Sequence, residues 1–409
     1  MSLVDDLSLV ASVLPEDVHS LHARLDGGDW IARALVATGT ATIRKRRLPA
    51  EQCVWLVLGM ALLRERRIEE VVRTLDLALP VASSKGVAPA AIPPARERLG
   101  SEPMKWLFTE SAKVWAAEGA DEQRWRGLAV YGVDGTTLRV ADTPENRAEF
   151  GGQWAGEQRG DNNYPIIHLV TLMALRTHVL AGAALDGDAN SSEQSLTPAL
   201  LQQVPNHSLT ILDRNFLSPL SLVPLQSGGA NRHWLTRAKS NTAMKSLEKL
   251  AEGDELVELK VSHEAQTKDP TLGKTWKARA IRYQRAGFKP QTLLTSLLDP
   301  VRWPAAEVIE MYHERWEPEL GYDEVKTELL QREESLRSKK PDGVRQETWG
   351  ILLAYNLVRL EIARVAKLVG VPPGADQLRA RADAHPQRMA VGEHLGRSRR
   401  DPEAPRAAA

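Results

Sequence analysis

The sequence predicts a mixed α/β protein with a helical amino-terminal domain and a β-rich insertion. Three observations support this fold class. Apolar residues recur at helical spacing early in the chain, short apolar runs typical of buried strands alternate with helical patterns over 128–237, and runs with a period of two follow over 246–299. A length of 409 residues predicts two or three domains, each large enough to bury a core.

The amino-terminal region is predicted to be helical. Residues 15–36 and 49–79 carry apolar residues at helical spacing, with charged residues between them. The segment 80–96 is rich in Ala, Pro, Ser and Gly, which is typical of a loop or linker. These segments predict a helical domain over 15–96, and a further helix over 102–117 leads into the next unit.

Residues 97–245 predict a sheet flanked by helices. The apolar run 128–133 ends at Asp134, and after Gly135 the run 136–140 is predicted to return as a second strand, because Asp-Gly is a favoured hairpin turn. The short strand 209–212 ends at Asp213. Further strands are predicted over 166–175, 179–185 and 234–237, and further helices over 192–204 and 218–226.

The carboxy-terminal half predicts an insertion, a resumed core and an atypical tail. Alternating runs predict a β-rich insertion over 246–300. A long helix is predicted over 305–330 and another over 344–369, so that the core resumes over 301–370. The tail, 371–409, lacks Ile, Phe, Trp and Tyr. It is either a disordered extension or an out-of-frame reading of a GC-rich gene.

Composition excludes several classes of protein. The one cysteine, Cys53, forbids an internal disulfide or a multi-cysteine zinc site and is expected to be a core residue. The start of the chain lacks the pattern of a secretory signal and no apolar run is long enough to span a bilayer, so a cytoplasmic location is expected. Net charge is zero, and two basic clusters are either solvated surface or DNA contacts. They are Arg44–Arg47 and the set Arg279, Arg282, Arg285 and Lys289.

Four side chains of the predicted helix 305–330 share one face. Tyr312, Arg315, Glu319 and Lys326 fall within an arc of about 60°, since each helical residue advances about 100°. The two cations favour an ionised Glu319 and are suited to hold phosphates. A solvated helix face of alternating charge is the simpler alternative.

Two aspartates are placed where a sheet can bring them together. Asp134 and Asp213 each close a strand-like run, which predicts carboxylates at the end of a sheet. With Glu319 they form a hard-oxygen site suited to two Mg²⁺ or Mn²⁺ ions and to in-line attack at phosphorus. Asp134 serving only a turn, and Asp213 only ending its strand, remain open alternatives.

These motifs together resemble one enzyme family. Asp134 in Tyr-Gly-Val-Asp-Gly-Thr-Thr-Leu, Asp213 in Leu-Asp-Arg-Asn-Phe-Leu-Ser, and the gapless spacing Tyr312-x2-Arg315-x3-Glu319-x6-Lys326 are similar to the DDE transposases of the insertion-sequence-4 type. The resemblance covers about residues 15–370. It implies a ribonuclease-H-like catalytic core interrupted by the β-rich insertion, and excision by cut and paste.

The resemblance also implies roles for individual residues. Asp134, Asp213 and Glu319 are expected to be the catalytic metal ligands. Tyr312, Arg315 and Lys326 are expected to grip phosphates beside the scissile bond, and Arg214, Arg237 and Lys239 to contact the DNA backbone. Trp276 or Trp303 is a candidate to stack on an extruded base. The expected partners are double-stranded DNA with terminal inverted repeats and a second copy of the chain in a synaptic complex, with no membrane.

Two other functions fit the same residues. A stand-alone nuclease of this fold cleaves DNA without joining ends. An inactive or repurposed DNA-binding protein keeps the fold and loses the chemistry, and the atypical tail motivates this alternative.

Overall fold

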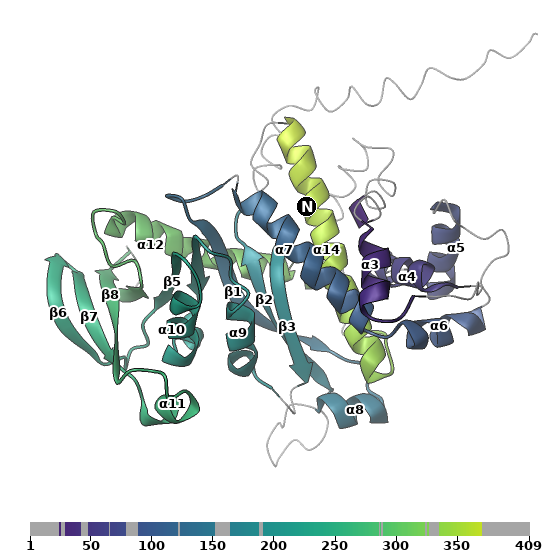
Figure 1. Ribbon diagram of the computed structural model, residues 1–409, viewed down its shortest axis with the longest axis horizontal. Coiled ribbons are helices and arrows are strands. Elements are labelled where there is room, and N and C mark those ends of the chain that lie inside the picture. The colour runs from purple at the N-terminus through teal and green to yellow at the C-terminus, as the bar shows by residue number, and fades with distance from the viewer. Residues whose placement is uncertain are drawn as a thin grey trace, which may run out of the picture.

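A mixed β-sheet is the central layer of the protein. The computed structural model describes residues 24–25, 29–41, 48–64, 66–78, 89–121, 123–151, 164–187, 191–285, 287, 289–323, 325–326 and 335–369. In this part of the chain nine strands form one sheet in the order β3-β2-β1-β4-β5-β9-β8-β7-β6 (Figure 1). They are β1 (Ala129–Arg139), β2 (Ile166–Ala174), β3 (Leu180–Gly187), β4 (Ser208–Leu212), β5 (Arg232–Arg237), β6 (Met244–Ala251), β7 (Asp254–Lys260), β8 (Thr275–Tyr283) and β9 (Gln291–Thr295). The predicted mixed α/β class is confirmed.

Strands β1, β4 and β5 run parallel at the centre of the sheet. Val133 pairs with Leu212, and Leu212 pairs with Thr236. The residues that follow these three therefore lie next to one another where β4 and β5 end. Alternate residues of β1 belong to different core clusters, as expected for a strand covered on both faces, because successive side chains point to opposite sides.

Strands β6 to β9 continue the same sheet as an antiparallel meander. β9 pairs with β5, and β8, β7 and β6 follow in order. Arg279 of β8 is fully buried and makes two hydrogen bonds to the Asp254 carboxylate, at 2.7 and 2.5 Å. A DNA-contact role for Arg279 is therefore wrong, because its guanidinium is used inside the sheet.

Helices cover both faces of the sheet and extend beyond one end of it (Figure 1). α12 (Ala305–His313) packs on one face through Val308, Met311 and Tyr312. α7 (Glu102–Asp121), α9 (Glu193–Leu201) and α10 (Pro219–Ser227) contact the sheet as well, and α14 (Pro341–Val369) packs against α7. The short helices are α8 (Pro144–Phe150), α11 (His263–Lys268), η3 (Glu314–Trp316) and α13 (Glu317–Asp323). Within the described ranges, no helix is both long and apolar enough to cross a membrane.

The amino-terminal helices pack on α7, on α14 and on one another. They are α3 (Trp30–Ala37), α4 (Ala50–Leu62), α5 (Ile68–Ala78), η1 (Pro89–Ala91) and α6 (Ile92–Leu99). Cys53 is buried in α4, as expected for a core residue. The predicted helical segment before residue 24, the basic run at 44–47 and the tail 371–409 lie outside the described residues.

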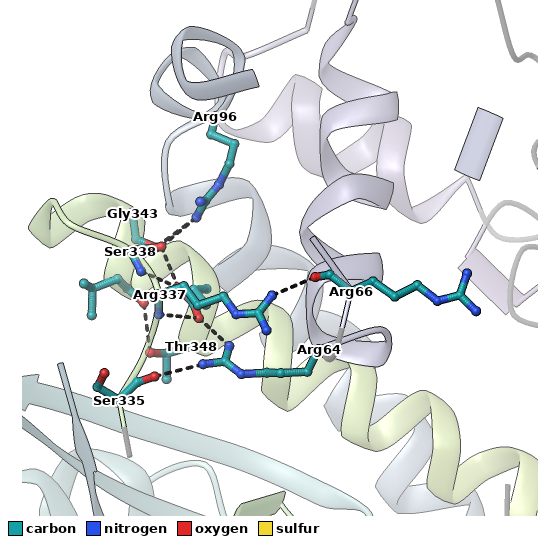
Figure 2. A network of polar contacts seen from close by, with 10 residues as sticks. Arg64, Arg66, Arg96, Ser335, Arg337, Ser338, Gly343 and Thr348 are labelled. Carbon is teal, nitrogen blue, oxygen red and sulfur yellow. Dashed lines mark hydrogen bonds and ion pairs between the residues drawn. The ribbon is translucent and has the colours of Figure 1, made fainter. Parts of the chain in front are cut away.

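A buried polar network joins this helical region to the start of α14 (Figure 2). Arg64 donates to Glu347 Oε1 at 2.6 Å, and its other terminal nitrogen donates to the Ser335 carbonyl at 3.0 Å. Glu347 Oε2 accepts from the Ser338 amide at 2.9 Å and hydroxyl at 2.6 Å. Arg96 also donates to the Ser338 hydroxyl, at 2.9 Å. Glu347 thereby fixes the segment 335–340 against both α4 and α14.

The predicted Asp134-Gly135 hairpin is wrong. β1 runs without interruption through both residues and pairs continuously with β2 from Tyr131 to Arg139. Neither residue has the positive φ that a two-residue Asp-Gly turn requires. Gly135 has a different use, which is described with the site below.

The single helix predicted over 305–330 is also wrong. α12 ends at His313, a 3₁₀ turn follows, and α13 begins at Glu317. Pro318 supplies the physical reason, because it has no N–H to donate to the carbonyl of Glu314 and its ring crowds that carbonyl. Proline is well tolerated in the first turn of the new helix, so the break falls where it does. Residues 327–334 lie outside the described part of the chain.

Candidate active site

The carboxyl edge of the parallel strands brings the two predicted aspartates together. Asp134 and Asp213 follow the paired residues Val133 and Leu212, so they occupy neighbouring positions on β1 and just after β4. Asp213 ends its strand, as predicted. Asp134 lies in the interior of β1, at the point where pairing with β4 stops. Arg237, at the end of β5, is next in the same row.

Asp134 is held in an acidic and half-buried environment. The pKa of its carboxyl is raised to about 6, mainly by burial and also by the charges of Glu319 and Glu193, whereas the Gly135 amide and Arg315 act to lower it. The Gly135 N–H donates to Asp134 Oδ1 at 2.9 Å. The negative charges around Asp134 therefore outweigh the nearby positive charge.

Arg315 links the other two carboxylates of the predicted site. Its Nη1 donates to Glu319 Oε1 at 2.9 Å and lies 3.9 Å from Asp213 Oδ1. The guanidinium also stacks over the Trp316 ring, 4.2 Å from the centroid. Arg315 and Glu319 are four residues apart on either side of the η3–α13 junction, so the helix break preserves their predicted contact.

The donor set fits a hard divalent cation in its chemistry. Three carboxylates from β1, the end of β4 and α13 gather at one edge, and carboxylate oxygens are the ligands that Mg²⁺ and Mn²⁺ prefer. Among the described residues, no three His, Cys, Asp or Glu side chains converge closely enough to hold an ion. Arg315 lies between Asp213 and Glu319. The two carboxylates can approach one ion only if the Arg315 side chain moves away.

Glu193 is a fourth carboxylate that sequence reasoning missed. It opens α9 directly after the N-cap Ser192. A Cβ built on Gly135 would lie 2.3 Å from the Glu193 carboxyl carbon and 2.5 Å from its Oε1, so only glycine at 135 admits this approach. The sequence predicted a helix start near 192, but nothing in it linked that helix to Asp134.

We expect the Glu193→Gln variant to bind Mn²⁺ at lower pH than the wild-type protein does. Removing the like charge lowers the pKa of Asp134, and a carboxyl must lose its proton before it binds a metal. The measurement is the Mn²⁺-induced rise in melting temperature across pH 5 to pH 8 or so. Glu145→Gln, an exposed glutamate on α8, is the matched control. An unchanged pH midpoint in Glu193→Gln would contradict the coupling.

A basic, aromatic pocket of about 170 Å³ lies beside the carboxylates. It is lined by Arg237, Tyr283, Arg285, Lys289, Gln291, Tyr312, His313, Arg315 and Trp316. Tyr312 is only 5% exposed; burial raises the pKa of its hydroxyl to about 12, against the opposing effect of Arg315 and Arg237. Trp316 is 56% exposed. The pocket joins cations to aromatic rings, which is the chemistry that holds single nucleotides.

The structure brings together only part of the predicted DNA-contact set. Tyr312, Arg315 and Arg237 share the pocket. Arg214 directly follows Asp213 and is exposed, and Lys239 is exposed just after β5. Lys326 is half-buried in a π-helical turn beyond α13. Arg285 and Lys289, which belong to the second basic cluster of the sequence, line the same pocket and were not in the predicted set.

The two tryptophans proposed to stack on a base are placed in packing contacts. Trp303 is 2% exposed and lies 5.1 Å, ring to ring, from Trp125. Trp276 packs against Trp234 at 5.2 Å. That role is therefore wrong for Trp303, whose ring faces are covered, and neither ring lines the pocket. The aromatic residues that line it are Tyr283, Tyr312, His313 and Trp316.

Fold and site together define a class of enzyme. The order β3-β2-β1-β4-β5, with carboxylates on β1, after β4 and on a helix packed beside them, is that of a ribonuclease-H-like nucleic-acid enzyme. Residues 125–357 match the transposase DDE domain, and residues 15–109 match the amino-terminal domain of insertion element 4 transposases. The chain belongs to the DDE transposases of this insertion-element type.

Two proteins of Escherichia coli (strain K12) are similar to it. The transposase InsG of insertion sequence element IS4 is 40% identical over 340 residues, which cover 83% of this chain and 75% of InsG. InsZ is 34% identical over 251 residues, which cover 61% of this chain and 82% of InsZ. A cryo-EM structure of a piggyBac transposase synaptic complex with hairpin DNA aligns with 95% of this chain and 79% of its own, at a TM-score of 0.40 and 12% identity. A likeness at that level carries no further argument.

Proposed function

We propose that this transposase cleaves DNA at the terminal inverted repeats of its insertion sequence and joins the freed ends to a target, by cut and paste. The observation that carries the proposal is the gathering of Asp134, Asp213 and Glu319 at one edge of the sheet. The charge of Glu319 acts on Asp134, and Arg315 lies close to both Glu319 and Asp213, so the three carboxylates belong to one electrostatic site.

The three carboxylates are proposed to hold two Mg²⁺ or Mn²⁺ ions. When bound, such ions supply activation of a water or a 3′-hydroxyl and stabilise the leaving oxygen. The chain supplies the rest. Arg315 exchanges its partner Glu319 for a phosphate oxygen, since a guanidinium binds either anion in the same geometry. Asp134 must be ionised to take part, which its raised pKa delays to about pH 6.

The pocket beside the carboxylates is proposed to receive the DNA strand next to the scissile bond. Tyr312, Arg315 and Arg237 hold phosphates there, with Arg285 and Lys289 beside them. Trp316 is the exposed ring that is available to an extruded base. Arg214, Lys239 and Lys326 are proposed to contact the backbone farther along the duplex.

We expect Arg237→Ala to weaken end binding and to lower its salt dependence. One phosphate contact fewer reduces the slope of log affinity against log salt by about one. The measurement is a gel-shift titration at several salt concentrations. Arg282→Ala is the control, because Arg282 belongs to β8, beyond β9 in the sheet, and pairs with Glu255 at 2.6 Å, outside the pocket. Equal slopes for Arg237→Ala and wild type would contradict the phosphate role.

The proposed domain organisation follows the sequence boundaries. Residues 15–96 form an amino-terminal domain, 97–245 and 301–370 form the two parts of the ribonuclease-H-like core, and 246–300 form the insertion between them. Two features support it. β6 to β9 lie on one side of the parallel strands in the sheet, and α3, α4 and α6 pack on α7 or α14. A homodimer is the proposed synaptic form.

Incubation with Mg²⁺ and DNA carrying the element's own inverted repeats tests the proposal. We expect cleavage at the repeat ends followed by strand transfer into a target plasmid. Cleavage without transfer would replace the proposal by a stand-alone nuclease. A gel shift without either reaction would replace it by a DNA-binding protein that has lost its chemistry.

A further inference from the structure

Tyr322 carries a buried hydroxyl that bridges the catalytic helix to the sheet. It lies on α13, one turn after Glu319, and is 6% exposed. Its hydroxyl donates to the backbone carbonyl of Asp134 at 2.5 Å. The same oxygen lies 2.8 Å from the Thr171 hydroxyl and accepts from the Thr171 amide at 3.2 Å. Since the one phenolic proton goes to Asp134, the Thr171 hydroxyl donates, and every valence of the Tyr322 hydroxyl is used.

The position of this bridge in the register is specific. Asp134 and Thr171 are directly opposite each other on β1 and β2. Tyr322 therefore binds the sheet at the one residue pair that contains the Asp134 carboxylate. Residues three apart in a helix lie on neighbouring parts of one face, so the turn that presents Glu319 is the turn that carries the anchor. The backbone of Asp134 and the backbone of Glu319 are thus joined through one side chain.

Two glycines let α13 approach the sheet closely enough for this contact. A Cβ on Gly132 of β1 would lie 2.7 Å from the Pro318 ring, and a Cβ on Gly321 of α13 would lie 2.3 Å from the Met173 methyl group. Both distances are shorter than real Cβ contacts allow. The glycines permit the close approach of α13 to the sheet. The Tyr322 hydroxyl fixes the position of α13 along β1 and β2, because a hydrogen bond is directional and packing of glycines is not.

We propose that Tyr322 is a positioning residue that sets the separation of Asp134 and Glu319 and thereby the affinity of the site for its metal ions. The inference rests on the proposed function in one respect, namely that these two carboxylates bind the metal. Tyr322 itself contacts neither metal nor DNA in this role. It acts through the backbone of one proposed ligand and the helix of the other.

The test is the Tyr322→Phe variant of the full chain, titrated with Mn²⁺. The Mn²⁺-induced rise in melting temperature reports binding without any DNA, and cleavage of an end duplex is measured in parallel. We expect both curves to need about tenfold more Mn²⁺ than in wild type, the lower end of the effect seen when groups that orient metal ligands are removed. Maximal cleavage returns at saturating Mn²⁺, and gel-shift affinity for the ends stays unchanged.

Three further variants separate positioning from folding. Thr171→Val is expected to shift the Mn²⁺ midpoint in the same direction, and Thr171→Ser, which keeps the hydroxyl, to restore it. Tyr355→Phe removes another buried hydroxyl beside α13, 3.2 Å from the Cβ position of Gly321, and is expected to leave the midpoint unchanged. If Tyr322→Phe does not fold, the Thr171 pair decides the question.

Distinct outcomes overturn the inference and the function beneath it. A Tyr322→Phe protein that melts at a lower temperature yet keeps the wild-type Mn²⁺ midpoint would make the hydroxyl merely structural. A shift of equal size in Tyr355→Phe would do the same. A wild-type protein that gains no stability from Mn²⁺ would overturn the metal site itself, and the inference with it.

Discussion

Glu319→Gln is expected to abolish cleavage while leaving end binding largely intact. The amide keeps the size of the side chain and removes the charge that a metal ligand needs. We expect the cleavage rate to fall by roughly a thousandfold or more, which corresponds to about 4 kcal/mol of lost transition-state stabilisation. The measurement is single-turnover cleavage of an end duplex at saturating protein and metal, with a gel shift on the same preparation.

Glu310→Gln is the matched control for this prediction. Glu310 is an exposed glutamate on α12, the helix that precedes α13. It should cleave within about twofold of the wild-type rate, since surface substitutions rarely matter. Cleavage retained in Glu319→Gln would refute the role of Glu319 as a metal ligand. Loss of end binding in that variant would instead make Glu319 a structural partner of Arg315.

Glu347→Ala is expected to cause the largest loss of stability among single substitutions in the described network. Glu347 and Arg64 are 3% and 1% exposed and joined at 2.6 Å. Breaking a buried pair leaves a buried charge without its counter-ion and costs about 3–5 kcal/mol. The measurement is the urea midpoint of unfolding. Arg64→Met combined with Glu347→Leu should recover part of the loss, because it removes both charges.

An exposed pair in the same region provides the comparison. Lys340 and Glu97 are 65% and 55% exposed and lie 2.7 Å apart, so Glu97→Ala should cost about 0–1 kcal/mol. Equal midpoints for Glu347→Ala and Glu97→Ala would contradict the account. Burial would raise the pKa of Glu347, but Arg64 and Ser338 hold it below the ordinary value of 4.5. The contribution of the ionised Glu347 to the free energy of unfolding is therefore present above pH 4.5, and it is lost as the pH falls through the lower pKa of the folded state.

The carboxylate pair on the sheet was predictable because apolar strand-like runs are visible in a sequence, although only Asp213 ends its strand and Asp134 lies inside β1. Asp134 and Asp213 each followed an apolar run, and parallel strands place such residues side by side. The hairpin at Asp134-Gly135 was mistaken because two different demands select the same dipeptide. A turn needs glycine for its positive φ, whereas here Gly135 makes room for the Glu193 side chain. That demand comes from a helix distant in sequence and leaves no local pattern.

The segment 305–330 shows a second limit of predicting helices from the spacing of residues. The spacing of Tyr312, Arg315 and Glu319 did predict a shared site, and all three lie near one another. The prediction assumed one regular helix, but Pro318 breaks that helix because it has no N–H to donate to the Glu314 carbonyl. The contact between Arg315 and Glu319 survives, because a 3₁₀ turn followed by an α-turn still stacks residues four apart.

Charge runs and tryptophans carried the least positional information. Arg279 and Arg285 belong to one basic cluster in the sequence, yet one is buried against Asp254 and the other lines the pocket. Arg279 lies within β8 and Arg285 lies beyond its end, and the Asp254 partner of Arg279 lies on β7. In the same way, Trp316, just before α13, stays exposed, whereas Trp303, just before α12, is covered by Trp125.

Locating the metal ions in a complex with end DNA is the most direct test of the proposed metal site. A crystal of the full chain with a terminal-repeat duplex and Mn²⁺ gives the ion positions from anomalous scattering. We expect Mn²⁺ at roughly 2.1 Å from carboxylate oxygens of Asp134, Asp213 and Glu319, with Arg315 moved from Glu319 to a phosphate. Mn²⁺ bound away from these three residues, or Arg315 still paired with Glu319 beside an occupied site, would contradict it.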